Sequence, residues 1–301
     1  MLRSMYSGIS GMKNFQVKLD VIGNNIANVN TYGFKKGRTT FKDLVSQQIA
    51  GASAPGTGRG GVNAKQVGLG SQLSSIDTVH TQGSLQNTNR PLDLGISGDG
   101  YFIVGTGAIN GAQPNAFTGT PEMNFTRAGN FYLDQQGNLV NSDGLFVIGQ
   151  PSTAPITVAP NPPTNSIDNG KFGKIVIPTS AKSFSVGSDG VVSYIDGTTG
   201  ALLKAGQIMI AKFPNNEGLE KVGGNLFKSS ANSGDLKVAA DMFVPSSGGA
   251  GSLVAGTLEM SNVDLSEEFT EMIVAQRGFQ ANTRIITTSD EILQELVNLK
   301  R

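Results

Sequence analysis

Few residues in this chain of 301 residues have the type and spacing that catalysis or metal binding requires. His80 is the only histidine and there is no cysteine, so a multi-histidine metal site, a disulfide and thiolate chemistry are unavailable. A single histidine in a strand-like segment is usually an ordinary structural residue, and we interpret His80 in this way. The sequence therefore predicts no catalytic residue, no metal site and no cofactor.

Three other patterns resemble functional motifs but have simpler explanations. Residues 56–61 match the glycine spacing of a dinucleotide-binding loop, although no strand-like segment precedes them and no apolar helix follows. The Asp-Gly pairs lack the alternating oxygen ligands and closing glutamate of a calcium loop, and they are typical of turns. Five glutamates lie on predicted helical faces, where they solvate the surface: Glu267, Glu268, Glu271, Glu291 and Glu295. We expect neither an enzyme nor a small-molecule substrate.

The composition indicates a turn-rich chain with no charge preference for a partner. Lys and Arg (23) balance Asp and Glu (23), so we expect no binding to nucleic acid or anionic membranes. The 40 glycines suit many turns and short strands. No apolar run has the length of a membrane span, and residues 1–30 lack the apolar core of a secretory signal peptide.

The two ends of the chain carry the strongest periodic pattern. Residues 1–30 and 258–301 have apolar side chains at alternating steps of three and four, which predicts two amphipathic helices with a coiled-coil seam. Polar residues interrupt both seams, and further apolar residues widen both stripes beyond what two helices cover. We therefore expect lateral packing in a polymer. The predicted subunit-interface residues are Leu2, Met5, Ile9, Met12, Leu19, Ile22, Ile26, Leu265, Phe269, Met272, Phe279, Ile286, Leu293 and Val297.

The middle of the chain divides into a connecting segment and a β-rich part. Residues 39–50 have one apolar face and predict a short helix, and residues 51–70 predict a Gly-rich loop, mobile or extended. From residue 71 to about 256 the apolar period changes to two, with turn signals between short strands. The predicted fold class is α+β: long terminal helices form a coiled-coil domain, and antiparallel hairpins build a β-rich domain. The predicted divisions are residues 1–33, 34–70, 71–256 and 257–301.

Four motifs follow one another along the chain. The N-terminal signature covers residues 19–28 and 31–35, and its turn contains Asn24, Asn25, Asn28, Thr31, Gly33 and Phe34. The middle motifs cover residues 92–102 and 125–131 with 133–134, and the C-terminal motif covers residues 259–262, 274–279 and 293–301. In this order the four motifs resemble those of the bacterial flagellar rod and hook proteins, whereas residues 105–124 and 150–170 match no motif.

The resemblance implies a subunit of an axial tube. The terminal helices would form an inner coiled-coil layer around an export channel, with the β-rich domain outside. The implied partners are further copies in a helical homopolymer, the adjacent rod and hook–filament junction proteins, the hook cap and the type III export apparatus. The implied location is the hook or basal body, extracellular after export without a cleaved signal peptide.

The motifs favour the hook subunit, a tubular universal joint that transmits motor torque to the filament. Residues 20–28, 31–35 and 296–299 resemble the hook protein most, and residues 51–70 and the Asn-rich turn would then be adjustable connections. The alternative is the distal rod, a rigid drive shaft, because the chain is short and residues 51–70 also resemble an insertion that stiffens the distal rod. A secreted β-rich binding module, whose helices would pair stably within a monomer, is a lesser alternative.

Overall fold

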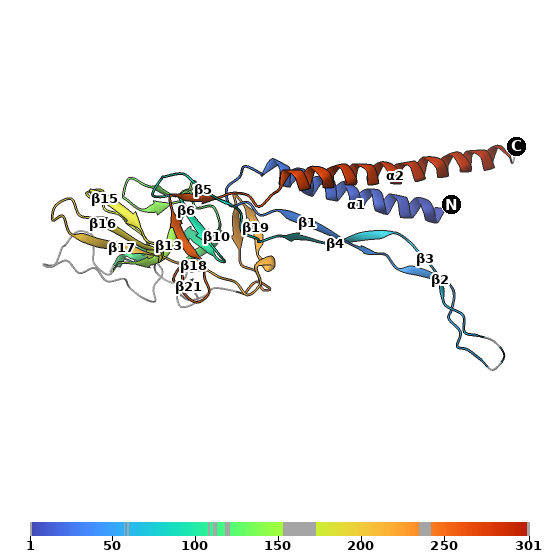
Figure 1. Ribbon diagram of the computed structural model, residues 1–301, viewed down its shortest axis with the longest axis horizontal. Helices are drawn as coiled ribbons and strands as arrows, with labels where there is room; N and C mark the ends of the chain where they lie inside the picture. Colours follow the sequence, from blue (N-terminus) through green and yellow to red (C-terminus); the bar gives the residue numbers. More distant parts are fainter. Residues whose placement is uncertain are drawn as a thin grey trace. The chain divides into compact units, whose positions relative to one another are not determined.

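The computed structural model describes residues 2–299 except 57, 59, 108, 111–112, 118–120, 153–172 and 235–241. It confirms the α+β class, with one helix at each end of the chain and antiparallel strands between them (Figure 1). The chain forms two compact units. The helical unit contains residues 1–29, 36–79 and 263–301, and the β unit contains residues 30–35 and 80–262. Strands thus occur in both units, whereas the sequence predicted a single β-rich block from residue 71.

The helical unit is built on α1 (Leu2–Ala27) and α2 (Leu265–Asn298), which pack against each other in antiparallel directions. The predicted C-terminal helix begins too early, because residues 257–259 form a strand. Asp264 sets the actual start: its carboxylate accepts hydrogen bonds from the backbone N–H groups of Ser266 and Glu267, an ordinary N-cap. Neither helix is long and apolar enough to cross a bilayer, judged over the described residues.

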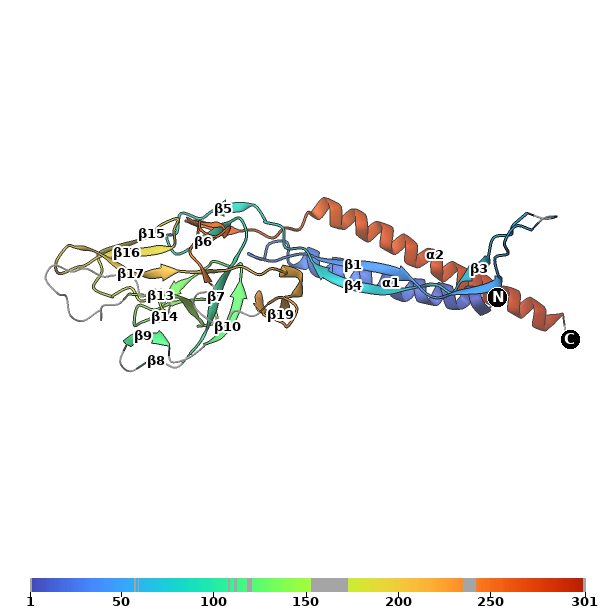
Figure 2. The ribbon, with the colours of Figure 1, turned by 90° about the horizontal axis from the view of Figure 1, so that it is seen from below.

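A long antiparallel ribbon completes the helical unit and lies along α1 (Figure 2). Its strands β1 (Gly37–Asp43) and β4 (Ser71–Thr78) pair with a bulge between Thr40 and Phe41. Beyond them, β2 (Ser46–Ala50) pairs with β3 (Lys65–Gly68), and Ser53 forms a bridge with Val62.

The ribbon corrects two sequence predictions. The short helix predicted for residues 39–50 is wrong, because these residues form β1 and β2. Phe41, Val45 and Ile49 recur every four residues, a spacing that fits a helix and also one face of a strand. The loop predicted for residues 51–70 is also wrong in part, since β3 pairs with β2. In both cases the outcome was decided by pairing with a strand distant in the sequence: Gly37 of β1 pairs with Thr78, and Ser46 of β2 pairs with Gly68.

The β unit contains one large antiparallel sheet and two smaller strand pairs. Within the described residues the sheet follows the order β15-β16-β17-β13-β7-β10-β20-β19, while β22 pairs with β6 and β23 pairs with β5. The strands of the first half are β5 (Leu85–Asn87), β6 (Leu94–Ser97), β7 (Tyr101–Thr106), β8 (Ile109–Asn110), β9 (Gln113–Phe117), β10 (Glu122–Thr126), β11 (Tyr132–Leu133), β12 (Leu139–Val140) and β13 (Phe146–Pro151). The rest are β14 (Gly173–Lys174), β15 (Ser183–Val186), β16 (Val191–Ile195), β17 (Leu202–Ile208), β18 (Ile210–Ala211), β19 (Glu220–Gly223), β20 (Leu226–Lys228), β21 (Met242–Phe243), β22 (Ser252–Ala255) and β23 (Thr257–Glu259), with a 3₁₀ turn at Asn216–Gly218.

Strand β7 lies at the centre of the core, because both of its faces are buried. Phe102 and Val104 point into one apolar cluster, whereas Tyr101 and Ile103 point into another. Phe102 packs edge-to-face on Phe131, with ring centroids 5.1 Å apart. Several predicted turns are present, including the one at Gly144, whose positive φ of 78° favours glycine. Most of residues 150–170, for which no motif was found, lie outside the described residues.

Candidate functional site: the paired helices and the segments that leave them

The two helices contact each other through small and polar residues. Gly8 and Gly11 of α1 lie against α2: a Cβ added at Gly8 would lie 3.5 Å from Ile286 Cγ1, and one at Gly11 would lie 3.0 Å from the Asn282 side chain. Farther along, a Cβ at Gly278 would lie 2.5 Å from the ring of Phe15. The absence of side chains at these glycines lets the backbones approach closely.

The contact seam is displaced by one residue from the predicted seam on α1. It follows Gly8, Gly11, Phe15, Ile22 and Asn25, which keep the spacing of three and four. On α2 the buried residues, among those described, are Glu268, Ala275 and Ser289. Sequence reasoning missed them because glycine, alanine and polar residues look like interruptions in an apolar pattern. The spacing of three between Gly8 and Gly11 and of seven between Glu268 and Ala275 was the available signal.

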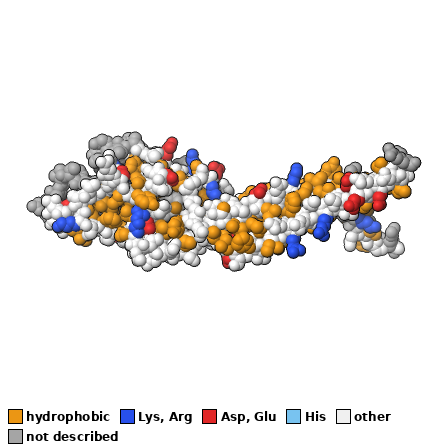
Figure 3. Space-filling model, turned by 90° about the horizontal axis from the view of Figure 1, so that it is seen from above, with side chains coloured by type: hydrophobic (Ala, Val, Ile, Leu, Met, Phe, Trp, Pro, Cys, Tyr) orange, Lys and Arg blue, Asp and Glu red, His pale blue; other side chains and the backbone are white. Residues whose placement is uncertain are grey.

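The predicted interface residues occupy the flanks of this seam. Ile22 is buried within the helical unit. A second group is half-buried: Met5, Ile9, Met12, Leu19, Ile26, Met272, Phe279, Ile286 and Leu293. Leu265, Phe269 and Val297 are exposed, as are Ile273, Ile285, Ile292 and Leu296, and the side chain of Leu2 lies outside the described residues. Figure 3 shows apolar side chains on the surface of the helical unit, at the right of the view. Their role in subunit contacts stays a prediction.

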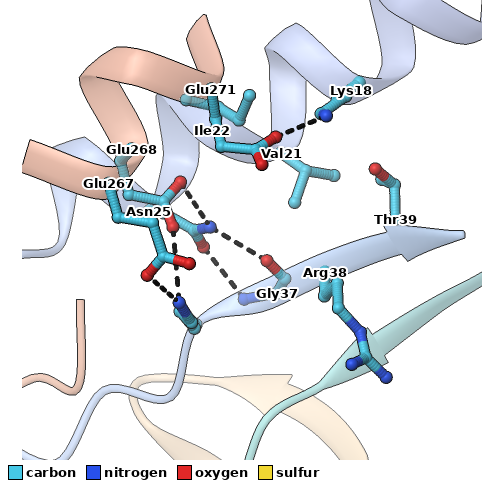
Figure 4. Close-up of a pocket in the computed structure, with 11 residues that line it drawn as sticks. Lys18, Val21, Ile22, Asn25, Gly37, Arg38, Thr39, Glu267, Glu268 and Glu271 are labelled. Carbon is cyan, nitrogen blue, oxygen red and sulfur yellow. Dashed lines mark hydrogen bonds and ion pairs between the residues drawn. The ribbon is translucent and has the colours of Figure 1, made fainter. Parts of the chain in front are cut away.

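Asn25 joins α1 to both α2 and β1 (Figure 4). Its Nδ2 donates to the carbonyl of Gly37 over 2.9 Å, and its Oδ1 accepts from the Gly37 N–H over 2.9 Å, so the amide pairs with β1 as a neighbouring strand would. The same Nδ2 also donates to Glu268 Oε2 over 3.1 Å. The sequence placed Asn25 in a turn, but it is a buried residue within the helix. Its function in the helical unit is structural.

The groove beside Asn25 has a volume of about 250 Å³ and carries three carboxylates. Glu271 pairs with Lys18, and Glu267 pairs with Lys36 Nζ over 2.7 Å, so their charges are compensated (Figure 4). Glu268 accepts from the Asn25 amide. The carboxylates are therefore engaged in holding the unit together, and across the described residues no group of three acidic, histidine or cysteine side chains could hold a metal ion.

The remaining residues of the signature turn lie on both sides of the boundary between the units. In the helical unit, Asn28 Nδ2 donates to the carbonyl of Asn24 over 2.9 Å at the end of α1. In the β unit, Gly33 has a φ of +70°, and its N–H donates to the carbonyl of Glu259 over 2.8 Å. Phe34 is buried beneath the Lys221 ammonium, 5.0 Å from the ring centroid, while Thr31 is half-buried.

A buried charge cluster in the β unit follows directly after this turn. The Glu259 carboxylate accepts from Lys35 Nζ over 2.5 Å, from Arg127 Nη1 over 3.1 Å and from the Gly83 N–H over 2.9 Å. Burial lowers the pKa of Lys35, although the facing Glu259 raises it. Residues 31–35 and 259–262 both belong to motifs noted in the sequence, but their pairing across 224 positions had no local signal.

His80 lies beside this cluster and hydrogen-bonds to the Tyr101 hydroxyl over 2.6 Å. Burial, and after it the nearby cations Lys35, Lys221 and Arg127, lower the pKa of His80 to about 4. Burial raises the pKa of Tyr101 well above its usual range. Both side chains are therefore neutral at pH 7. These properties agree with the structural interpretation of His80 made from the sequence.

Comparison with known proteins identifies the family. Three family models match the chain: "Flagella basal body rod protein" over residues 5–35, "Flagellar hook protein FlgE/F/G D1 domain" over residues 95–194, and "Flagellar basal body rod FlgEFG protein C-terminal" over residues 254–299. The flagellar basal-body rod protein FlgG of Bacillus subtilis is 57% identical over 301 residues and all of both chains. The FlgG of Caulobacter vibrioides is 34% identical over 302 residues, covering 99% of this chain and all of the relative.

Hook proteins are also similar, at lower identity. The flagellar hook protein FlgE of Borreliella burgdorferi is 33% identical in an alignment of 458 positions that covers all of both chains. That relative therefore contains long stretches with no counterpart among the 301 residues of this chain. The chain belongs to the family of bacterial flagellar rod and hook proteins, and it is a structural component of the flagellum rather than an enzyme.

Proposed function

We propose that the chain is a distal rod subunit of the flagellar basal body, which polymerises into a stiff drive shaft. The observation that carries this proposal is the 57% identity to a rod protein FlgG, in an alignment that covers all of both chains. Hook proteins align only at lower identity and with long additional segments. The rod alternative is thus better supported than the hook function that the sequence motifs favoured.

The helical unit supports self-assembly because its own residues do not cover its apolar surface. Phe269, Ile273 and Ile292 are exposed on α2, by 50%, 55% and 42%. Phe269 and Ile273 are one helical turn apart on the same face of α2, and neighbouring exposed apolar side chains of this kind indicate a protein-binding surface. Further copies of the chain are the partners that a homopolymer provides. Neighbouring rod and hook components, the hook cap and the export apparatus remain expected partners from the family resemblance.

The ribbon of residues 37–78 supports a stiff polymer. It exposes Val45, Ile49 and Ile76, and an isolated two-stranded ribbon is marginally stable in water. In an assembly, neighbouring subunits would cover these side chains and add contacts between protofilaments. This role replaces the adjustable connection expected for residues 51–70 in a hook.

Electron microscopy of polymers grown from the purified chain tests the proposal. We expect straight tubes from the intact chain. We expect tubes with greater curvature from a variant lacking residues 52–68, because the ribbon end would no longer cross-link protofilaments. A variant with Gly-Ser repeats of equal length at 52–68 controls for chain length. Strongly curved tubes from the intact chain would support the hook function instead, and a folded monomer that never polymerises would support a binding module.

A further inference from the structure

The chain passes between its two units at four places, and the passing segments are held together inside the β unit. The passages follow residues 29, 35, 79 and 262. Within the β unit, the Asn262 N–H donates to the carbonyl of Phe34 over 3.4 Å, and Asn262 Nδ2 donates to Thr81 Oγ1 over 3.0 Å. All three passing segments, residues 30–35, 80–83 and 259–262, are thus connected with one another.

Glu259 is the residue on which these connections converge. Its backbone carbonyl accepts from the Gly33 N–H of the first segment. Its carboxylate accepts from Lys35 of the first segment and from the Gly83 N–H of the second. Arg127, from the loop after β10, supplies the fourth donor. A single side chain and its own backbone thus contact every segment through which the chain leaves the β unit.

The burial of this cluster makes it sensitive to the loss of the carboxylate. The side chains of Lys35 and Glu259 are fully buried, and that of Arg127 is 3% exposed. Two cations share one anion, and two further donors reach backbone carbonyls: Lys35 Nζ donates to Thr81 and Arg127 Nη2 donates to Gly98. The buried Arg127 Nε has no hydrogen-bond partner. Removing one partner of a buried pair leaves an uncompensated charge out of water, which is strongly unfavourable.

The next residue along the chain provides a contrast. Lys36 lies in the helical unit and pairs with Glu267, whose side chain is 56% exposed. Exposed ion pairs contribute little and are screened by salt. Lys35, in the β unit, thus makes a buried ion pair, and Lys36, the first residue of the next helical-unit segment, makes a solvated one.

We infer that Glu259 is a positioning residue that holds the three passing segments in a fixed register at their β-unit ends. Where the chain bends between the units, the bend therefore lies on the helical-unit side of these segments. The inference concerns the single subunit and holds for a rod or a hook protein alike. If the chain is a rod subunit as proposed, torque carried by the β unit reaches all of these passages together through Glu259.

Amide hydrogen exchange of the full-length monomer tests this inference. Glu259→Gln should accelerate exchange at the amides of Gly33, Gly83 and Asn262 at least tenfold, while the amides of β7 keep their rates. Glu267→Gln, which breaks the solvated pair, should leave all of these rates unchanged. Asp93→Asn serves as a matched control, because Asp93 is a buried carboxylate paired with Arg90 over 2.8 Å in the same unit. It should not accelerate exchange selectively at the three passage amides.

Two outcomes would overturn the inference. Equal acceleration throughout the β unit in Glu259→Gln would show that the cluster only stabilises the unit, and unchanged passage amides would show that Glu259 does not hold them. If Glu259→Gln fails to fold, the double variant Lys35→Met with Glu259→Gln removes one buried cation together with the anion and permits the same measurement. Salt provides a second readout: 1 M NaCl should leave passage exchange in the wild-type chain unchanged, because the Lys35–Glu259 pair is buried.

Discussion

The two units of this chain complete their interiors in different ways. The β unit encloses two apolar clusters, and its central strand β7 is buried on both faces. The helical unit brings its helices together at Gly8, Gly11 and Gly278, and leaves many of its large apolar side chains exposed. A fully buried Leu or Phe side chain contributes about 1.5–3 kcal/mol, whereas a glycine at a contact contributes almost nothing through burial. From this comparison we expect the β unit to be stable alone and the helical unit to be completed by assembly.

Truncation in the core of the β unit should give the largest effect. Phe102→Ala should lower the free energy of unfolding by about 3–5 kcal/mol, because Phe102 is fully buried against Phe131. Ile273→Ala on the exposed face of α2 should change it by less than about 0.5 kcal/mol in the monomer. Urea denaturation followed by circular dichroism measures both. Similar losses in the two variants would contradict the comparison.

A charge on the exposed face of α2 should affect assembly instead of monomer stability. Phe269→Asp should raise the critical concentration for polymerisation at least tenfold, because the half of the ring that is exposed in the monomer can contribute about 1–1.5 kcal/mol on burial and the new carboxylate adds a desolvation cost. Gln280→Asp places the same charge at an exposed polar position of α2 and should polymerise nearly normally. Sedimentation of polymers against subunit concentration gives both values. Normal assembly of Phe269→Asp would remove this face from the interface.

Alanine substitutions at two helix glycines test which of them lies at the contact between α1 and α2. Gly278→Ala should destabilise the helix pair by about 1–3 kcal/mol, because the new methyl group would lie 2.5 Å from the Phe15 ring. Gly23→Ala should stabilise α1 by roughly 0.5–1 kcal/mol, since no atom lies within 4 Å of the added Cβ. Thermal unfolding of the helices by circular dichroism should show opposite shifts. Equal shifts would mean that Gly278 is not a contact position.

Acid should weaken the β unit through His80. Its pKa of about 4 in the folded chain lies below the ordinary value of 6.5, so the unfolded chain binds the proton more readily in this range. The contribution of neutral His80 is therefore complete above about pH 6.5 and is lost as the pH falls towards 4. Urea denaturation at pH 7 and pH 4.5 should show a smaller loss in His80→Gln than in the wild-type chain. An identical loss would exclude His80 as the titrating group.

The sequence predicted those parts of the fold that depend on local periodicity. Both terminal helices and the change to period two were correct because apolar spacing reports one buried face. The helix predicted at residues 39–50 failed because a four-residue spacing does not distinguish helix from strand, and the pairing of Phe41 with Leu73 decided the structure. The contacts of α1 with α2 at Gly8 and Gly11 were not foreseen, because glycines are not conspicuous in an apolar pattern. The Lys35–Glu259 pair joins residues distant in sequence, so no local pattern could reveal it.

Limited trypsin digestion of the chain, as monomer and as polymer, tests the central claim most directly. In the monomer we expect rapid cleavage at Lys13, Lys18, Arg277 and Arg284 in the helices, and survival of a fragment close to residues 19–277, which keeps the whole β unit. In the polymer the same sites should be protected, because neighbouring copies complete the helical unit. A monomer whose helices resist trypsin as well as the β unit does would contradict the account, since the helix pair would then be stable without assembly.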